Sequence, residues 1–396
     1  MAHDQEGVAG SPLTSLLLER IRDSGPLTVA DFVDAALYHE TLGYYARAGQ
    51  RSGREGDFFT SVDLGPMFGE LLAGQFAKMR EVLAGGSATG GVGTAAAGFD
   101  LVEAAAGNGR LARDILDHAE QHDPDFYRAI RLRLVERSPQ ARAGQHAVLG
   151  RHTRTLQSST ADVPEGVAGV IYANELLDAL APHLVVMREQ GLREVYVDSA
   201  DGRLLTREGP PSSPRIAEYL AAVGAHLEPG WFAEVNLAAA DWIRRAGHCL
   251  ERGFLVIIDY GHDAAVLYSA SHATGTLTTY RGHAAERRED GPGWLLEPGE
   301  RDITSHVDLT GIALAGRDAG MRLVGVVDQA SFLLGLGLAE RLADSDGSSR
   351  RALARRLALK TLVLPGGLGN TLKVMVFAKS VDGPPLRGLS FGGRVT

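Results

Sequence analysis

The stretch FDLVEAAAGNGRLA, residues 99–112, decides the fold of this chain. A short apolar run is closed by Glu103, glycines follow at Gly107 and Gly109, and apolar residues then recur at helical spacing. This order predicts a strand, a glycine turn and a helix, which together form the first βα unit of a nucleotide-binding α/β sheet. Because glycine lacks a Cβ, a ligand can lie against the backbone of the turn and face the free N–H groups of the helix start.

Two ligand classes use such a turn. The letters GNGRLA at 107–112 satisfy the G-x-G-x-x-A fingerprint of dinucleotide-binding folds, which is a weak signal on its own. The run EAAAGNG at 103–109 instead resembles the first motif of class I S-adenosylmethionine (SAM) methyltransferases. A carboxylate at the strand end suits a sulfonium ligand that carries an ammonium group, but it is unfavourable beside a pyrophosphate. We therefore favour SAM, and a turn that only packs the helix on the strand is the structural alternative.

Composition narrows the class of protein. The chain has 396 residues, 44% of them hydrophobic, and a formal net charge of −9. We expect a cytoplasmic protein, because no apolar run approaches the roughly 20 residues of a membrane span and no secretory signal pattern is present. Scattered Lys and Arg argue against a nucleic-acid partner. Cys249 is the only cysteine, which excludes an internal disulfide and a cysteine-rich metal site.

The pattern predicts three regions. Residues 1–98 form an N-terminal helical cover and lid, ending in a Gly/Ala-rich linker, and residues 381–396 form a flexible tail. Residues 99–380 form the Rossmann-like catalytic domain. Two insertions interrupt this domain, one at about 184–250, which begins with a hairpin, and one at about 262–310.

Polar residues follow the later strands of the predicted sheet. Glu136 ends the second strand, where a carboxylate can accept hydrogen bonds from ribose hydroxyls. Asn174, Glu175 and Asp178 lie just past the strand at 167–173, and Tyr260, together with its neighbour Asp259, ends the most apolar strand. Ligands of open α/β sheets bind at this edge. The alternative is an ordinary helix start, with Asn174 as cap and the acids complementing the helix dipole.

An aromatic and small-polar loop at 44–63 precedes a helix. It includes Gly56, Asp57, Thr60 and Ser61, which we assign to cofactor binding as part of a lid. The alternative is a capped loop whose hydroxyl groups satisfy helix N–H groups.

Metal binding is not expected from the sequence. Asp302, His306 and Asp308 lie near His283, but their spacing fits no zinc motif.

With these residues the chain resembles the MidA-like family of class I SAM-dependent methyltransferases. Members of this family are bacterial relatives of the mitochondrial complex I assembly arginine methyltransferase. The similarity extends over nearly the whole chain as an ordered series. Its segments are GDFFTS at 56–61, FGEL at 68–71, EAAAGNGRL at 103–111, VERSP at 135–139, NELLDALAPH at 174–183, IDYG at 258–261, GTLTTYRGH at 275–283, DITSHVDL at 302–309 and QASFLLGLG from Gln329.

The resemblance implies a seven-stranded, mostly parallel sheet whose last strand is antiparallel. It also implies SAM over Gly107 and Gly109 with its ribose on Glu136, S-adenosylhomocysteine as product, and methylation of a protein arginine in a respiratory quinone-oxidoreductase subunit. Two departures affect this inference. Ala105 replaces a motif glycine, which should displace the turn slightly and weaken SAM binding, and Val-Asp at 62–63 replaces the usual Pro-Glu.

The predicted reaction is N-methylation of a cationic protein or peptide side chain. In this reaction Glu175 and Asp178 act as catalytic carboxylates, and Asn174 and Tyr260 are orienting groups. The residues predicted to contact the cofactor are Glu103, Gly107, Gly109, Glu136 and Asn174. A homodimer is compatible with the sequence. The alternatives are a tailoring methyltransferase acting on a peptide or metabolite, a SAM-binding assembly factor with little turnover, and an NAD-dependent oxidoreductase.

Overall fold

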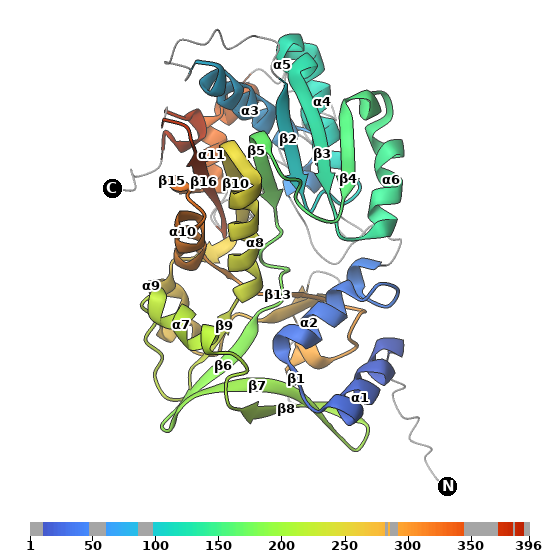
Figure 1. Ribbon diagram of the computed structural model, residues 1–396, viewed down its shortest axis with the longest axis vertical. Coiled ribbons are helices and arrows are strands. Elements are labelled where there is room, and N and C mark those ends of the chain that lie inside the picture. Colours follow the sequence, from blue (N-terminus) through green and yellow to red (C-terminus); the bar gives the residue numbers. More distant parts are fainter. Residues whose placement is uncertain are drawn as a thin grey trace.

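A computed structural model describes residues 11–46, 61–85, 98–281, 284–285, 292–343, 371–382 and 385–391. Within these ranges the main sheet has the strand order β15-β16-β10-β5-β2-β3-β4 (Figure 1). The strands are β2 (Phe99–Ala104), β3 (Ile130–Val135), β4 (Leu156–Thr160), β5 (Val167–Asn174), β10 (Leu250–His262), β15 (Arg322–Asp328) and β16 (Leu372–Lys379). The short β14 (Val307–Asp308) also pairs with the end of β10.

The sheet is parallel except at one strand. β16 runs antiparallel to both of its neighbours, β10 and β15, whereas β2 pairs in parallel with β3 and β5. The predicted seven-stranded α/β fold with an antiparallel last strand is therefore confirmed. Central strands such as β5 read as continuous apolar runs because both of their faces are buried.

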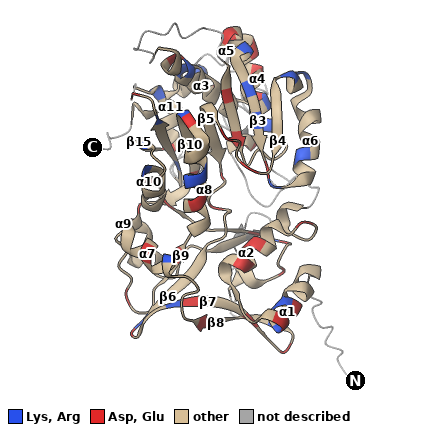
Figure 2. Ribbon diagram, viewed as in Figure 1, with Lys and Arg blue, Asp and Glu red and all other residues tan. Residues whose placement is uncertain are grey.

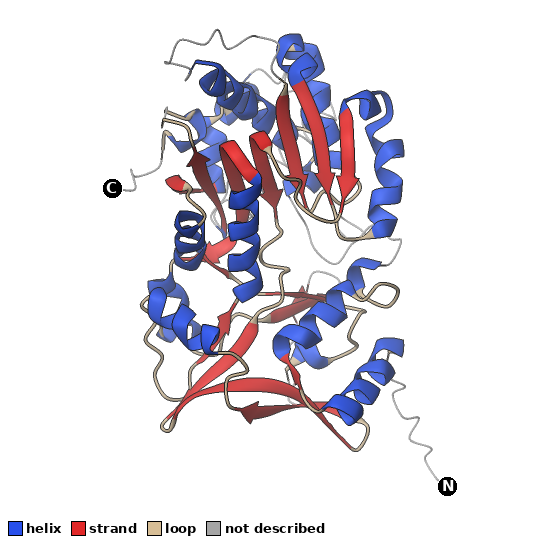
Figure 3. Ribbon diagram, viewed as in Figure 1, coloured by secondary structure: helices blue, strands red, loops and turns tan. Residues whose placement is uncertain are grey.

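Helices cover both faces of the sheet (Figure 3). On one face, a core of Leu71, Phe76, Ile115 and Phe332 packs against Leu101. The helices of this face are α3 (Met67–Gly85), α4 (Arg110–His122), α5 (Pro124–Ala129), α11 (Gln329–Gly335) and α12 (Leu338–Ala343), with α6 (Pro139–Leu149) beside α4. The other face is covered by α8 (Leu237–Cys249) and α10 (Leu309–Asp318). The α3 helix, which the sequence analysis placed in the N-terminal cover, thus packs on the sheet beside α4.

The rest of the N-terminal segment and the two insertions form a second lobe (Figure 1). Phe32, Val186, Trp294 and Ile303, from both insertions and the cover, share one core. Its strands are β1 (Leu27–Thr28), β6 (His183–Arg188), β7 (Gly191–Ala200), β8 (Arg203–Gly209), β9 (Phe232–Val235), β11 (Thr278–Arg281), β12 (Ala284–Ala285) and β13 (Asp302–Thr304). Its helices are α1 (Pro12–Ser24), α2 (Val29–Tyr38), α7 (Pro214–Ala222) and α9 (Ala264–Leu267). The antiparallel β6–β7 pair confirms the predicted hairpin.

Three predictions fall partly outside the described ranges: the linker at 84–98, of which residues 86–97 are not described, the lid at 44–63, of which residues 47–60 are not described, and the C-terminal tail. Among the described helices, none is long and apolar enough to cross a membrane. Figure 2 shows that acidic and basic positions are interspersed, and α1 and α5 each carry both signs.

Candidate active site

The candidate site lies at the carboxyl edge of the main sheet, which faces the second lobe (Figure 1). The glycine turn follows β2, Glu136 follows β3, and the NELLD segment follows β5. Because these strands are parallel neighbours, their ends meet at one edge. The sequence motifs that are far apart along the chain are therefore brought together here.

The glycine turn has the backbone that the motif requires. Gly107 and Gly109 have φ values of 51° and 84°, in the left-handed region. The Gly107 N–H donates to Glu136 Oε2 at 2.9 Å, and Gln145 Nε2 donates to the Gly107 carbonyl at 2.8 Å. An added Cβ at Gly107 would meet nothing within 4 Å, so the outer side of the turn is open to a ligand.

Ala105, in the same turn, has a strained backbone conformation. Its φ is 54° and its side chain is exposed, so an L-residue is held in a conformation that glycine adopts freely. The predicted effect of the Ala105 substitution thus has a structural basis in backbone strain, while its effect on SAM affinity stays a prediction.

Glu136 is a half-buried carboxylate that fixes the turn. Besides the bond from Gly107, its Oε1 accepts the Ser138 N–H at 2.7 Å. Each carboxylate oxygen has a second lone pair, so both can still accept a ribose hydroxyl. Glu136 therefore fits the predicted ribose contact and also organises the backbone that would carry the cofactor.

The side chain of Glu103 is buried in the protein and is not exposed at the turn. Its carboxyl group contacts the Tyr172 hydroxyl at 3.0 Å and the Ala112 N–H. Burial raises the pKa of Glu103 to about 8. A carboxyl group that is largely neutral near pH 7 offers little charge to an ammonium group, so its predicted contact with the cofactor stays a prediction.

Glu175 is held in strained backbone at the end of β5. Its φ is 54°, and its N–H donates to the Ile258 carbonyl at 2.8 Å. Its Oε1 accepts from Asn174 Nδ2 at 2.9 Å. Burial and the neighbouring Asp178 raise the pKa of Glu175 to about 8. A raised pKa and a non-glycine residue at positive φ are both features of functional sites.

Asp178 and Asp259 form a carboxyl pair. The two groups are close enough for each to affect the pKa of the other. Burial and the adjacent Asp178 hold the pKa of Asp259 well above its usual range. Asp259 also accepts the N–H groups of Leu176 and Leu177, at 3.0 and 2.7 Å, and Thr304 donates to Asp178 at 3.0 Å.

Two buried amide atoms at this edge have no protein partner among the described residues. Asn174 Oδ1 is an unpaired acceptor, and Gln329 Nε2 is an unpaired donor. Ser61 links Gln329 to Glu175, because its hydroxyl donates to Gln329 Oε1 at 2.9 Å and its N–H donates to the Glu175 carboxyl group. Buried polar groups are normally paired, so these atoms are suited to contact a polar ligand.

The second lobe reaches this edge through α2 and the residues that follow it. The Tyr38 hydroxyl donates to the Ala179 carbonyl at 3.1 Å, and its ring lies 4.4 Å from the Arg137 guanidinium. Tyr45 donates to Asp302 Oδ1 at 3.1 Å. The aromatic cover is thus attached directly to the segments after β3 and β5.

The remaining predicted residues are placed as follows. Tyr260 lies near the end of β10 next to Asp259, and its N–H donates to the Asp259 carboxylate. Ser61 is buried and contacts Gln329 and Glu175. Gly56, Asp57 and Thr60 lie outside the described residues.

Arg110 has a partner that bears on the dinucleotide alternative. Its guanidinium pairs with the buried carboxylate of Asp63 at the start of α4. A pyrophosphate bound at this turn would lie near Arg110, but the charge of Arg110 is already neutralised by Asp63. This pairing weakens the dinucleotide alternative.

Some residues were missed or undervalued from the sequence. Asp259 had been noted only as a polar strand end, although an acid directly after the buried run 254–258 is a recognisable signal. Gln329 was quoted only as part of a motif. His306, which was considered with His283, Asp302 and Asp308, lies beside His262 and His272. His283 lies outside the described residues.

The geometry of the site is compatible with the predicted SAM contacts. The open glycine turn with Glu136 can carry the nucleoside, and the unpaired amide atoms and carboxyl groups can contact the charged end. This arrangement is consistent with comparisons to known proteins. Residues 71–327 match the family model described as S-adenosyl-L-methionine-dependent methyltransferase.

Curated relatives carry a more specific name. The chain is 30% identical over 365 residues to the protein arginine methyltransferase NDUFAF7, mitochondrial, of Bos taurus, covering 84% of this chain and 75% of that protein. The Homo sapiens protein of the same name is 29% identical over 361 residues, with 84% and 75% covered.

A solved structure is similar over almost the entire chain. It is a crystal structure of a superfamily member from Burkholderia thailandensis bound to S-adenosyl-homocysteine. The TM-score is 0.84 at 28% identity, and the match covers 97% of this chain and 95% of that one.

Proposed function

This chain belongs to the S-adenosyl-L-methionine-dependent methyltransferase family. We propose that it transfers the methyl group of SAM to an arginine side chain of a protein. SAM is the cofactor of this family, and the enzyme is a methyltransferase. The arginine acceptor is the proposed part. It rests on the names of the relatives and, in this chain, on the carboxyl cluster of Glu175, Asp178 and Asp259.

The carboxyl cluster suits a guanidinium. Glu175 and Asp178 lie on one short segment, and the unpaired Asn174 Oδ1 adds a third acceptor beside them. A guanidinium presents five N–H donors in a plane, so it can be held by two carboxylates and an amide oxygen at once. A lysine ammonium is a compact point charge and would use this arrangement less completely.

Proton transfer is the main task of the protein groups. Bound SAM supplies an electrophilic methyl group on a sulfonium. A guanidinium has no free lone pair at neutral pH, so the nitrogen that is methylated must lose a proton. Glu175, with a pKa of about 8, can accept that proton, and the Asp178–Asp259 pair can stabilise the remaining positive charge.

The substrate is proposed to be a protein segment, and a subunit of a quinone oxidoreductase is the specific candidate. The second lobe contacts the sheet edge through Tyr38, whose hydroxyl donates to the Ala179 carbonyl directly after Asp178, so residues of the second lobe lie beside the carboxyl cluster. A tailoring methyltransferase acting on a small metabolite is the alternative, because the same acids could hold another cation.

Methyl-labelled SAM tests the proposal directly. The purified enzyme is incubated with protein extract from cells that lack it, and the labelled protein is hydrolysed to amino acids. We expect label in methylarginine over several turnovers, and loss of labelling with Glu175→Gln. Label in a small metabolite with none in arginine would contradict the proposed acceptor, and binding without multiple turnovers would favour an assembly factor.

A further inference from the structure

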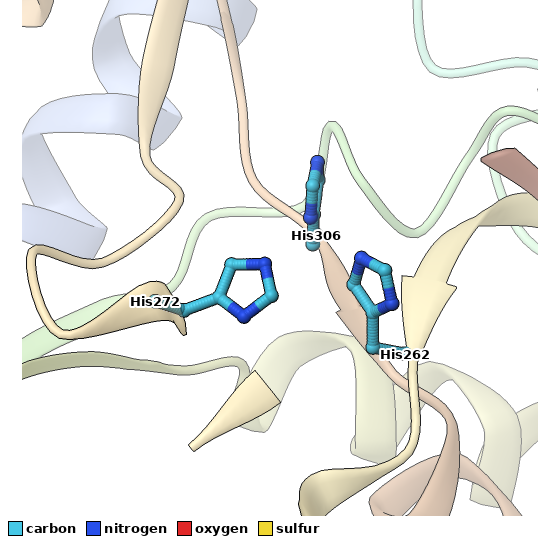
Figure 4. Close-up of side chains that lie close together, drawn as sticks. All are labelled: His262, His272 and His306. Atoms are coloured by element: carbon cyan, nitrogen blue, oxygen red, sulfur yellow. The ribbon is translucent and has the colours of Figure 1, made fainter. Parts of the chain in front are cut away.

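Three histidines from separate elements meet near the end of β10 (Figure 4). His262 is the last residue of β10, His272 ends the 3-10 helix Ala270–His272, and His306 lies between β13 and β14. One ring nitrogen from each lies within 4.8 Å of the other two. All three side chains are partly buried, so this is an ordered cluster rather than a set of free surface rings.

The ring nitrogens are available as lone-pair donors. His272 Nδ1 lies 3.0 Å from the Val266 carbonyl, which can only accept, and 3.1 Å from the Ser271 hydroxyl. A proton on Nδ1 satisfies the carbonyl and leaves the lone pair on Nε2. Such a backbone contact is the usual way in which a ligating imidazole is oriented. His306 Nδ1 is buried and has no hydrogen-bond partner among the described residues.

The size of the cluster is close to that of a metal site. Three atoms no more than 4.8 Å apart can all lie within about 2.8 Å of one central point. Zinc–nitrogen bonds are about 2.0–2.1 Å long, so each nitrogen would move inward by about 0.7 Å. A small side-chain rotation supplies such a movement.

We propose that His262, His272 and His306 bind a divalent transition-metal ion, with zinc as the metal that best suits three imidazoles and an open fourth position. Imidazole nitrogen is a preferred ligand of zinc, and sites with three histidines leave one position for water or another ligand. This inference does not depend on the identity of the methyl acceptor.

The ion would connect the segments that carry the catalytic acids. His262 follows Asp259 on β10, and His306 lies shortly after Thr304, whose hydroxyl donates to Asp178. The loop that carries His272 also contains Thr276, which is bound to the buried Glu234. Metal binding would therefore hold two loops of the second lobe against the carboxyl edge of the sheet.

Zinc titration of the untagged full-length protein, after chelator treatment and dialysis, tests the site. We expect calorimetry to show about one high-affinity zinc ion per chain and cobalt to give intensified visible absorption. His272→Ala should weaken zinc binding by at least about 100-fold, since loss of a ligand should exceed the 10–100-fold effect of outer-shell changes. His248→Ala, at an exposed histidine on α8, is the matched control and should bind zinc as the wild type does.

Binding of S-adenosylhomocysteine separates this proposal from the methyltransferase assignment. His272→Ala should retain it, which also shows that the variant is folded. If this variant does not fold, His262→Gln takes its place in the same comparison. No zinc binding by the wild type, or equal zinc binding by the wild type and the histidine variant, would overturn the proposal.

Discussion

Asp259, near the end of β10, accepts the N–H groups of Leu176 and Leu177 at 3.0 and 2.7 Å, in the segment that follows the neighbouring strand β5. Its carboxyl group also interacts with that of Asp178, and this interaction together with burial raises the pKa of Asp259. Asp259 at the same time caps the backbone that follows β5. Asp259 therefore affects both the backbone conformation of the NELLD segment at 174–178 and the electrostatic environment of its acids.

Substitution of Asp259 should separate these two roles. Asp259→Ala leaves the N–H groups of Leu176 and Leu177 without an acceptor, and we expect the free energy of unfolding to fall by about 2–4 kcal/mol. Asp259→Asn keeps an acceptor oxygen and a donor to Asp178, and should cost less than about 1 kcal/mol. Urea unfolding of both variants measures this difference, and equal losses would show that the backbone contacts contribute little.

Relief of the strained turn should stabilise the protein. Ala105→Gly is expected to raise the free energy of unfolding by roughly 0.5–1 kcal/mol, because left-handed backbone costs about 1–2 kcal/mol and glycine's greater unfolded-state freedom offsets part of this. We expect SAM binding to be at least as tight as in the wild type.

Ala106→Gly is the control for this change. Ala106 is buried and is not at positive φ, so its replacement should destabilise the protein by roughly 1 kcal/mol. A loss of stability in Ala105→Gly as well would show that the turn is not strained by its alanine.

Loss of the Glu136 carboxylate should weaken the cofactor site. Glu136→Ala removes a charge-assisted hydrogen bond to the ribose and the acceptor for Gly107, and we expect SAM binding to weaken by about 1.5–3 kcal/mol. Calorimetry measures the affinity for SAM. The control is Glu165→Ala, at an exposed acid before β5. Unchanged affinity in Glu136→Ala would mean that Glu136 serves the turn but not the ligand.

The pH dependence of methyl transfer should report Glu175. Its pKa of about 8 means that the carboxyl group is mostly protonated below that pH and cannot take a proton from the acceptor. At saturating SAM, kcat/KM for an arginine peptide should therefore rise with pH and level off above about 8. In Glu175→Gln the remaining activity should lose this rise. A profile that is flat in the wild type between pH 6 and 9 would exclude Glu175 as the base.

The fold could be predicted from the sequence because its signals are local. The stretch after Phe99 contains a strand, its glycine turn and a helix start within one continuous segment, and the structure has all three. The buried runs of β5 and β10 were equally clear. The placement of α3 was not, because apolar periodicity shows that a helix has a buried face but not which surface covers it.

The site was predictable only in part. Asn174, Glu175 and Asp178 could be placed at the correct edge, since residues after parallel strands meet there. The contact of Asp178 with Asp259 depends on β5 and β10 being neighbours, although the whole first insertion separates them in sequence. The burial of Glu103 under Tyr172 likewise depends on which face of β2 it occupies and on the strand beside it.

The central claim is that this enzyme methylates a protein arginine held by the carboxyl cluster. Mass spectrometry of protein methylation in cells tests this claim most directly. Cells with the wild-type enzyme, without it, and with Glu175→Gln are compared for methylated arginine and for methylated metabolites. The account predicts at least one arginine that is methylated only in cells with the wild-type enzyme. If no arginine changes in any strain while a small metabolite gains a methyl group with the wild type, the account is contradicted.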